Sequence, residues 1–259
     1  MRLYNLNIGI KLDNTSDVLE NIKQFNADIC TFQEAMMAKE NSCFDMFKSA
    51  NIIIKNANYK YNNFSPIYIA KGVEKDGVMV RAFGGLSEQG SLLISKFEIN
   101  NAQNLFYYNN YKTYYDATYF KEQDWARSIQ TCILNINGNP LQIINVHGIW
   151  TKDKLGDNRT IKQSQFILEH ARKDIPCIIV GDFNLLPNST SIKILNEQFN
   201  NLINLYNIKT TRPTFDDGLD KGNLVCDYIF VNNKVNVKDF KVVNSNISDH
   251  LPLILDFEI

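Results

Sequence analysis

Charged and hydrogen-bonding side chains recur where apolar runs of the chain end. The clearest case is the run 175–180, which is followed by Gly181, Asp182, Phe183 and Asn184. Because Asp182 and Asn184 are two residues apart, an extended chain places both on one face, while Phe183 points into the core. The run itself predicts a strand buried on both faces. A carboxylate and an amide at the end of a rigid strand are well placed to act as a catalytic pair.

The same pattern occurs at the ends of other predicted strands. The polar residues found there are Asn7, Glu34, His147, Asp182, Asn184, Asp227, Asp249 and His250. Carboxylates from separate strands, with few histidines and no cysteine, describe an oxygen-rich site that suits Mg²⁺ or Mn²⁺ better than zinc. A nearby histidine and aspartate can position and activate water against a phosphate. Each residue taken alone is equally compatible with a structural role, because strand-end polar residues often form turns or caps.

Three further residues are weaker candidates for substrate contacts: Arg127, Arg159 and Trp150. For both arginines an exposed, solvated position is at least as plausible, and Trp150 could instead pack as a hydrophobic anchor. The loop after His147 contains the basic residues Lys152, Lys154, Arg159 and Lys162. Because aspartates are interleaved among them, we expect a solvated loop rather than a substrate-facing patch.

The elements that must position these residues alternate between strands and helices. Apolar and alternating runs predict strands at 2–10, 28–34, 61–70, 91–95, 127–136, 140–147, 175–180, 224–231, 235–243 and 251–257. Helical spacing and capping residues predict helices beginning near 16, 41–42, 158 and 189. Asn137-Gly138-Asn139 predicts a hairpin turn. Many strands with helices between them predict a single domain with an α/β layered sandwich.

Two segments allow more than one interpretation. Residues 71–90 are Gly-rich and are expected to form hairpins or loop. Residues 104–120 are rich in aromatic residues. We favour cross-strand aromatic pairing within a hairpin there, over a platform on which bases stack.

The composition bounds the class of protein. The 259 residues include 27 basic and 28 acidic side chains, so the net charge of −1 argues against a global attraction to nucleic acid or to an anionic membrane. A local basic patch stays possible. The five cysteines are widely spaced, without a C-x-x-C pair, which indicates buried, reduced thiols in a cytoplasmic protein. We expect no membrane span and no signal peptide, and a monomer is plausible.

Taken together and in order, the motifs resemble the endonuclease/exonuclease/phosphatase superfamily, which includes the deoxyribonuclease I-like enzymes. The matching pieces are Leu6-Asn7-Ile8, Gln33-Glu34, Gly90-Ser91-Leu92-Leu93-Ile94-Ser95, Asn145-Val146-His147, Gly181-Asp182-Phe183-Asn184, Cys226-Asp227-Tyr228-Ile229 and Ser248-Asp249-His250. They run from the first strand to the last, so the resemblance covers essentially the whole chain, 1–259, as one domain. It implies a four-layer αββα sandwich of two mainly antiparallel or mixed β-sheets flanked by helices.

The resemblance also implies where a metal would bind. Glu34 would bind Mg²⁺ or Mn²⁺, with Asn7 beside it. Asp249 would lie near this metal or at a second metal position.

Catalytic roles are implied in the same way. Asp182 would orient and deprotonate the attacking water, and Asn184 would steady the site and the pentacovalent phosphorus. His250 would contact the phosphate, and Asp227 would hold the imidazole in orientation. His147 would touch the phosphate from the other side.

Three functions follow, and the sequence separates them only weakly. The first is hydrolysis of a phosphodiester in DNA or RNA by a divalent-metal enzyme. The second is a phosphomonoesterase or phospholipid phosphodiesterase, acting on inositol phosphates or sphingomyelin. The third is a catalytically inactive binding module, against which the intact set of acids and histidines counts. Repair of abasic sites is disfavoured, because Ile8-Gly9-Ile10-Lys11 departs from the glycine-then-arginine pattern of those enzymes and no tryptophan precedes Asp227.

Overall fold

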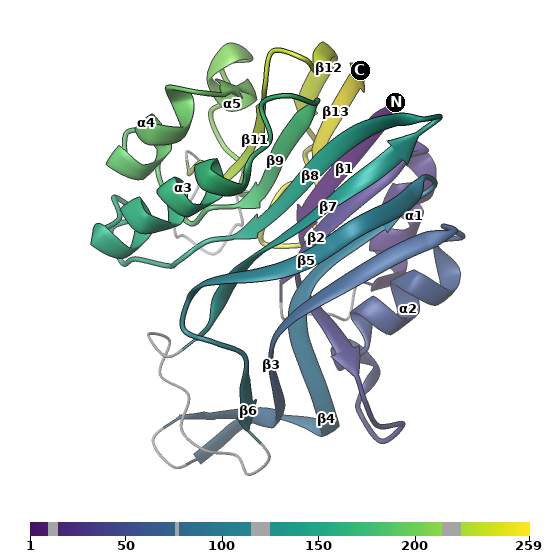
Figure 1. The fold of residues 1–259 in the computed structure, drawn as a ribbon. Coiled ribbons are helices and arrows are strands. Elements are labelled where there is room, and N and C mark those ends of the chain that lie inside the picture. The colour runs from purple at the N-terminus through teal and green to yellow at the C-terminus, as the bar shows by residue number, and fades with distance from the viewer. Residues whose placement is uncertain (10–14, 76–77, 115–124, 214–223) are drawn as a thin grey trace.

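The structure is a computed structural model that describes residues 1–9, 15–75, 78–114, 125–213 and 224–259 (Figure 1). Several residues that the sequence predictions name lie outside the described residues. They are Ile10 at the end of the first strand, Lys11, and the aromatic residues Tyr115, Tyr119 and Phe120.

Two mixed β-sheets form the centre of the molecule. In the described part of the chain, one sheet has seven strands, in the order β12 (Asn236–Val242), β13 (Leu253–Glu258), β1 (Arg2–Asn7), β2 (Ile29–Ala38), β4 (Val78–Ser95), β3 (Tyr61–Lys75) and β6 (Lys112–Tyr114). The other has six, in the order β10 (Asn200–Asn201), β11 (Asp227–Val231), β9 (Cys177–Asp182), β8 (Asn139–His147), β7 (Arg127–Ile136) and β5 (Glu98–Tyr108). The pairs β1–β2, β3–β6 and β8–β9 are parallel, and the other pairs are antiparallel.

Helices cover the outer faces of both sheets. The helices α1 (Thr15–Phe25) and α2 (Ser49–Asn56) lie against the seven-stranded sheet, whereas α3 (Asn158–His170), α4 (Thr190–Asn196) and α5 (Leu202–Leu205) lie against the other (Figure 1). The starts of two of them follow from local capping: Asp157 accepts from the backbone of Arg159 (2.8 Å), and Ser189 accepts from Ile192 (3.3 Å). The predicted layered αββα sandwich is therefore confirmed.

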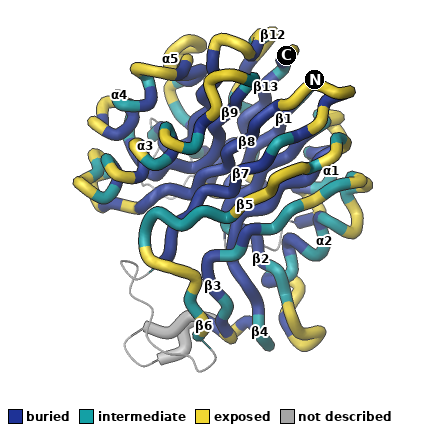
Figure 2. Tube along the Cα trace, in the orientation of Figure 1, coloured by how far each residue is buried: buried dark blue, intermediate teal, exposed yellow. Residues whose placement is uncertain are grey.

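The core follows the alternation of the strands. On β1, Leu3 belongs to the apolar cluster between the sheets, while Tyr4 and Leu6 belong to the cluster under α1 and α2. All three are fully buried. Figure 2 shows the resulting buried centre, with the exposed segments on the outer helices and at the loops.

Several predictions of local structure are corrected. The helix expected from Asn41 or Ser42 is divided into a short 3₁₀ helix (Asp45–Phe47) and α2. For the segment 71–90 the expected hairpin is confirmed, because its described residues belong to the antiparallel pair β3–β4. Over the described residues 104–114 the predicted aromatic hairpin is wrong, because β5 pairs with β7 in one sheet and β6 pairs with β3 in the other. The chain therefore crosses between the sheets at this point.

Other local predictions are confirmed. β7 and β8 form a hairpin around Asn137 and Gly138, whose φ angles of 52° and 93° are those that a tight two-residue turn requires. All five cysteines are buried and free of disulfides. Within the described residues, no helix combines the length and the apolar character that crossing a membrane requires.

Candidate active site

The end of β9 brings three of the predicted residues into one row. Asp182 is paired in register with His147 of β8 on one side and with Asp227 of β11 on the other. Gly181 makes this possible, because its φ is +139° and a Cβ atom there would lie 2.0 Å from the Val146 carbonyl oxygen. The close approach of β8 and β9 thus sets the spacing of the row.

The seven-stranded sheet contributes a second group opposite this row. Asn7 pairs in register with Gln33, and Glu34 follows at a bulge with φ of +58°. The left-handed conformation of a glutamate is uncommon, and such strain concentrates at functional sites. The Asn7 amide donates to Glu34 Oε1 (3.1 Å) and to Asp182 Oδ2 (3.0 Å), so one side chain joins the two sheets. Its oxygen accepts from the Gly9 N–H (2.9 Å).

Asp182 is held by donors on nearly all sides. Besides Asn7, the Asn184 backbone donates to Oδ1 (2.8 Å) and the Asn184 amide donates to Oδ2 (3.2 Å). Asn184 has a φ of +56°, so the chain turns after Phe183 instead of remaining extended, yet the predicted pair still meets. Burial raises the pKa of Asp182 despite the nearby His250. A carboxylate has about four lone-pair directions, so one acceptor position remains for a further donor such as water.

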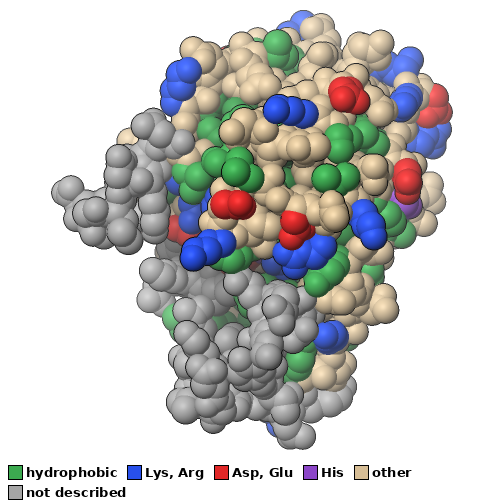
Figure 3. Space-filling model, turned by 90° about the vertical axis from the view of Figure 1, so that its left-hand side faces the viewer, with side chains coloured by type: hydrophobic (Ala, Val, Ile, Leu, Met, Phe, Trp, Pro, Cys, Tyr) green, Lys and Arg blue, Asp and Glu red, His purple; other side chains and the backbone are tan. Residues whose placement is uncertain are grey.

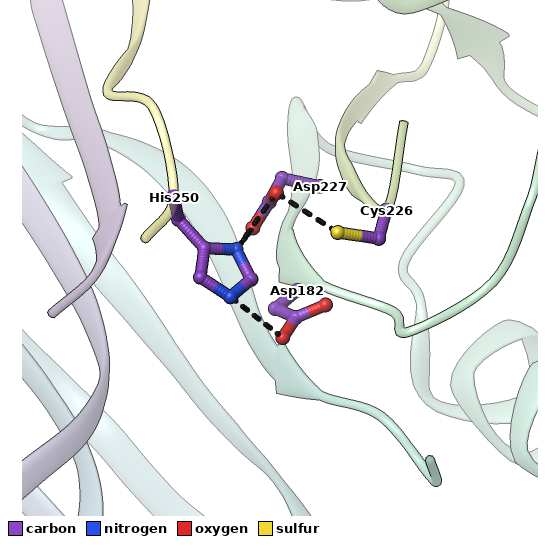
Figure 4. A group of neighbouring side chains, drawn as sticks. All are labelled: Asp182, Cys226, Asp227 and His250. Atoms are coloured by element: carbon purple, nitrogen blue, oxygen red, sulfur yellow. Dashed lines mark hydrogen bonds and ion pairs between the residues drawn. The ribbon is translucent and has the colours of Figure 1, made fainter. Parts of the chain in front are cut away.

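His250 stands beside Asp182 and is oriented by Asp227. Its Nδ1 lies 2.8 Å and 2.9 Å from the two Asp227 oxygens, and its Nε2 lies 3.7 Å from Asp182 Oδ2 (Figure 4). Thr211 donates to Asp227 Oδ2 (2.7 Å). Burial opposes the charge on the imidazole, but Asp227 and Asp182 outweigh it and raise the pKa of His250 well above its ordinary value.

His147 has the opposite electrostatic character. Its Nε2 lies 3.6 Å from Glu34 Oε1. Burial, with the positive charge of Arg127 behind it, lowers the pKa of His147 well below its ordinary value. Burial also raises the pKa of Glu34. At neutral pH the two imidazoles therefore differ, because His147 is neutral and His250 favours the charged form.

The sequence of the chain matches a known family of proteins over most of its length. The sequence model of the endonuclease/exonuclease/phosphatase family matches residues 3–250. The chain belongs to this family. No match was found among the curated proteins. The predicted resemblance is therefore confirmed at the level of the family.

Solved structures share the fold. A family member from Leptotrichia buccalis C-1013-b has a TM-score of 0.71 at 18% identity, with both chains covered in full. TDP2 from D. rerio, complexed with a single strand DNA product, has a TM-score of 0.68 at 13% identity, over 100% of this chain and 99% of that one. A mannosyl-6-phosphatase from Bacteroides thetaiotaomicron VPI-5482 has a TM-score of 0.65 at 14% identity, with both chains covered in full.

Within this family fold, one compact buried group of possible metal ligands includes two residues of the row. One ligand atom from each of Asp182, Cys226, Asp227 and His250 lies within 4.8 Å of the others. Its chemistry does not suit a metal ion. Asp227 already accepts hydrogen bonds from His250 and Thr211, and burial raises the pKa of the Cys226 thiol to about 11, so that it stays protonated.

The oxygen-rich side of the site suits a hard cation better. The Glu34 side chain is 21% exposed, and within the described part of the chain its one salt-bridge contact is with neutral His147. Asp182 and Asp249 lie close enough for their charges to raise the pKa of Glu34 further. Carboxylate and amide oxygens are the donors that Mg²⁺ and Mn²⁺ prefer.

The three weaker candidates for substrate contacts differ in burial and in the residues that they contact. Arg127 is buried behind His147 and donates to the backbone oxygen of Gly148 (2.9 Å). Arg159 pairs with Asp157 (2.6 Å) at the start of α3, outside the group. Trp150 is 41% exposed.

The charged loop after His147 was predicted to be solvated, and for Lys154 this is wrong. Its Nζ donates to Asn184 Oδ1 (3.1 Å) and lies 5.9 Å from the centre of the Trp150 ring.

The sequence analysis did not identify Arg212 as a residue of the site. Its guanidinium donates to Asp249 (2.7 Å) and contacts His250 Nε2. Arg212 follows two threonines in a stretch without strand or helix periodicity, so no local pattern identifies it.

Proposed function

We propose that this protein is a divalent-metal-dependent phosphoester hydrolase that cleaves phosphodiesters of nucleic acid. The observation that carries the proposal is the environment of Asp182. This buried carboxylate has a raised pKa, three N–H donors and one remaining acceptor position, and it lies 3.7 Å from a histidine that favours its charged form. A base and a cation so close together suit attack of water on an anionic centre.

The side chains of the site divide the work. Asp182 takes the proton of the attacking water, and its raised pKa makes it a better base than an ordinary aspartate. Asn184 fixes the Asp182 carboxylate through two hydrogen bonds. His250, held by Asp227, donates to the phosphoryl oxygens from one side. His147, being neutral, supplies a hydrogen bond from the other.

Glu34, Asn7 and Asp249 are the residues that would hold the metal ion. Bound there, Mg²⁺ or Mn²⁺ would act as a Lewis acid that neutralises charge on the phosphoryl oxygens. The Asn7 amide group separates the carboxylates of Glu34 and Asp182 by donating to both, which keeps the proton acceptor distinct from the metal ligand.

Two observations bear on the substrate. The D. rerio TDP2 structure with the same fold contains a single strand DNA product, and Trp150 with Lys154 offers an aromatic ring and a cation beside Asn184. Such a pair suits a base next to a phosphate. On the face shown in Figure 3, basic and acidic side chains are interspersed over the described surface. This favours a substrate bound locally over avid, non-specific binding of duplex DNA.

A second candidate is a phosphomonoesterase, which the shared fold of the mannosyl-6-phosphatase supports. A panel of single- and double-stranded DNA, RNA, inositol phosphates, sugar phosphates and sphingomyelin separates the candidates. We expect turnover of a nucleic acid with Mg²⁺ or Mn²⁺ and none in chelator. Turnover that persists in chelator contradicts the proposal, and exclusive turnover of a monoester selects the second candidate.

A further inference from the structure

Arg212 lies in the segment before β11, and the backbone there is fixed. Thr210 Oγ1 accepts from the Arg212 N–H (3.0 Å) and donates to the Arg212 carbonyl oxygen (2.8 Å). The neighbouring Thr211 donates through its N–H to the Leu224 oxygen (3.0 Å), and its own carbonyl accepts from Leu251 (2.8 Å). The start of the Arg212 side chain is therefore held relative to β11 and to the segment before β13.

The guanidinium group is largely enclosed, and one of its three nitrogens has no partner among the described residues. Nη2 donates to Asp249 Oδ2 (2.7 Å), and Nη1 contacts His250 Nε2. The side chain of Arg212 is 15% exposed. Its Nε–H is buried and has no hydrogen-bond partner among the described residues. Buried donors are nearly always paired, so this one indicates an acceptor that is added to the site.

The contact between Arg212 and His250 places another part of the guanidinium group where a ligand of His250 would bind. Nδ1 of His250 faces Asp227, so only Nε2 is available to a ligand. Arg212 Nη1 lies against this same Nε2. A phosphoryl group bound at Nε2 would therefore also meet Nη1, and guanidinium groups bind phosphoryl oxygens through charge-assisted hydrogen bonds.

We propose that Arg212 is a catalytic residue that contacts the phosphoryl group of the substrate together with His250. On substrate binding, Arg212 exchanges its contact with His250 Nε2 for the phosphoryl oxygens, and Asp249 keeps the guanidinium aimed. The guanidinium group then stabilises the negative charge that grows on these oxygens during attack by water. This inference rests on the proposed phosphoester hydrolysis and adds to it a cation that the protein itself supplies.

The test compares Arg212→Ala and Arg212→Lys with Arg172→Ala. Arg172 is also paired with an aspartate, Asp174, but on the exposed surface, so it controls for the loss of an ion-paired arginine. Calorimetry measures the affinity of each protein for inorganic phosphate in Mg²⁺, and kinetics give kcat and KM. We expect Arg212→Ala to lower kcat by about 10²- to 10³-fold and phosphate affinity by about 10-fold or more. Added guanidinium ion should restore part of the turnover, while Arg172→Ala matches the wild type.

The role is overturned if a folded Arg212→Ala protein keeps both kcat and phosphate affinity within about threefold of the wild type. Were Arg212→Ala to unfold, Arg212→Lys gives the same decision, because lysine keeps the charge and loses the planar guanidinium group. If Arg212→Lys retains both kcat and phosphate affinity, Arg212 acts only by neutralising Asp249. This result also overturns the inference. If the wild type turns over no phosphoester, the proposed function fails. Phosphate binding that depends on Arg212 would then still support the contact.

Discussion

Asp182→Asn offers the sharpest test of the site, because it changes one carboxylate oxygen to an amide nitrogen and little else. The Asp182 carboxylate accepts from Asn184 at Oδ1 and from Asn7 and Asn184 at Oδ2. If the substituted side chain keeps its oxygen at the Oδ2 position, its NH₂ faces the Asn184 N–H. One hydrogen bond becomes a conflict between two donors, which costs about 1–3 kcal/mol.

Removal of the Asp182 charge has the opposite effect on the free energy of unfolding. Burial raises the pKa of Asp182, so the ionised carboxylate destabilises the folded state at pH 7 by about 1.4 kcal/mol for each unit of the rise. The neutral amide relieves this. The two effects oppose each other, so the net change in the free energy of unfolding should be small. For a domain of this size about 1 kcal/mol shifts the melting temperature by about 2–4 °C, and we expect a shift of a few degrees in either direction.

Activity should respond far more strongly. Loss of a general base lowers kcat by about 10²- to 10⁴-fold, which corresponds to about 3–5 kcal/mol in the barrier. Steady-state kinetics on the best substrate of the panel and thermal melts in chelator measure the two quantities. Asp174→Asn, at an exposed aspartate, is the control and should change neither. A folded Asp182→Asn protein with kcat within about tenfold of the wild type would refute the assignment of Asp182 as the base.

Two further substitutions test the neighbours of Asp182. Asp227→Asn places an amide against His250 Nδ1 and should lower kcat by about 10²-fold or more with the fold intact; steady-state kinetics check this, and normal kcat would show that Asp227 does not orient the imidazole. Glu34→Gln tests the metal ligand. Because burial raises the folded-state pKa of Glu34, the metal-free wild type loses stability as the pH rises through that pKa. In chelator at pH 7 the glutamine variant should therefore melt above the wild type, and Mg²⁺, which stabilises the wild type by binding only the folded state, should no longer raise its melting temperature. Equal responses of both proteins to Mg²⁺ in thermal melts would exclude Glu34 as a ligand.

Sequence reasoning succeeded where the chemistry follows a local pattern. Asp182 is the last residue of the apolar strand β9, and the neighbouring strands end at His147 and begin at Asp227, so all three meet at one edge of the sheet. The bulge at Glu34 could not be predicted. The polar residues Gln33 and Glu34 predicted that the strand ends there, yet β2 continues to Ala38, and its register with β4 shifts between Phe32 and Ala35.

Sequence reasoning failed for residues that reach the site from loops. Lys154 contacts Asn184, and Arg212 contacts His250, which is 38 residues further along the chain. Neither contact follows a period of 2 or 3.6 residues, which is what a sequence pattern detects. The aromatic segment failed for a related reason, because alternation predicts a strand but does not say to which sheet the strand belongs.

The site also depends on how the two sheets are aligned, since each supplies part of it. Apolar contacts between sheets are not directional and do not fix a lateral position. Hydrogen bonds do, and Gln33 of one sheet donates to Asn145 Oδ1 of the other (2.6 Å) and to Asn5 of its own sheet (2.9 Å). Gln33 is next to Glu34, and Asn145 is two residues before His147. The 3.6 Å separation of Glu34 and His147 is therefore set by a buried amide contact one or two residues away, and not by the apolar core around it.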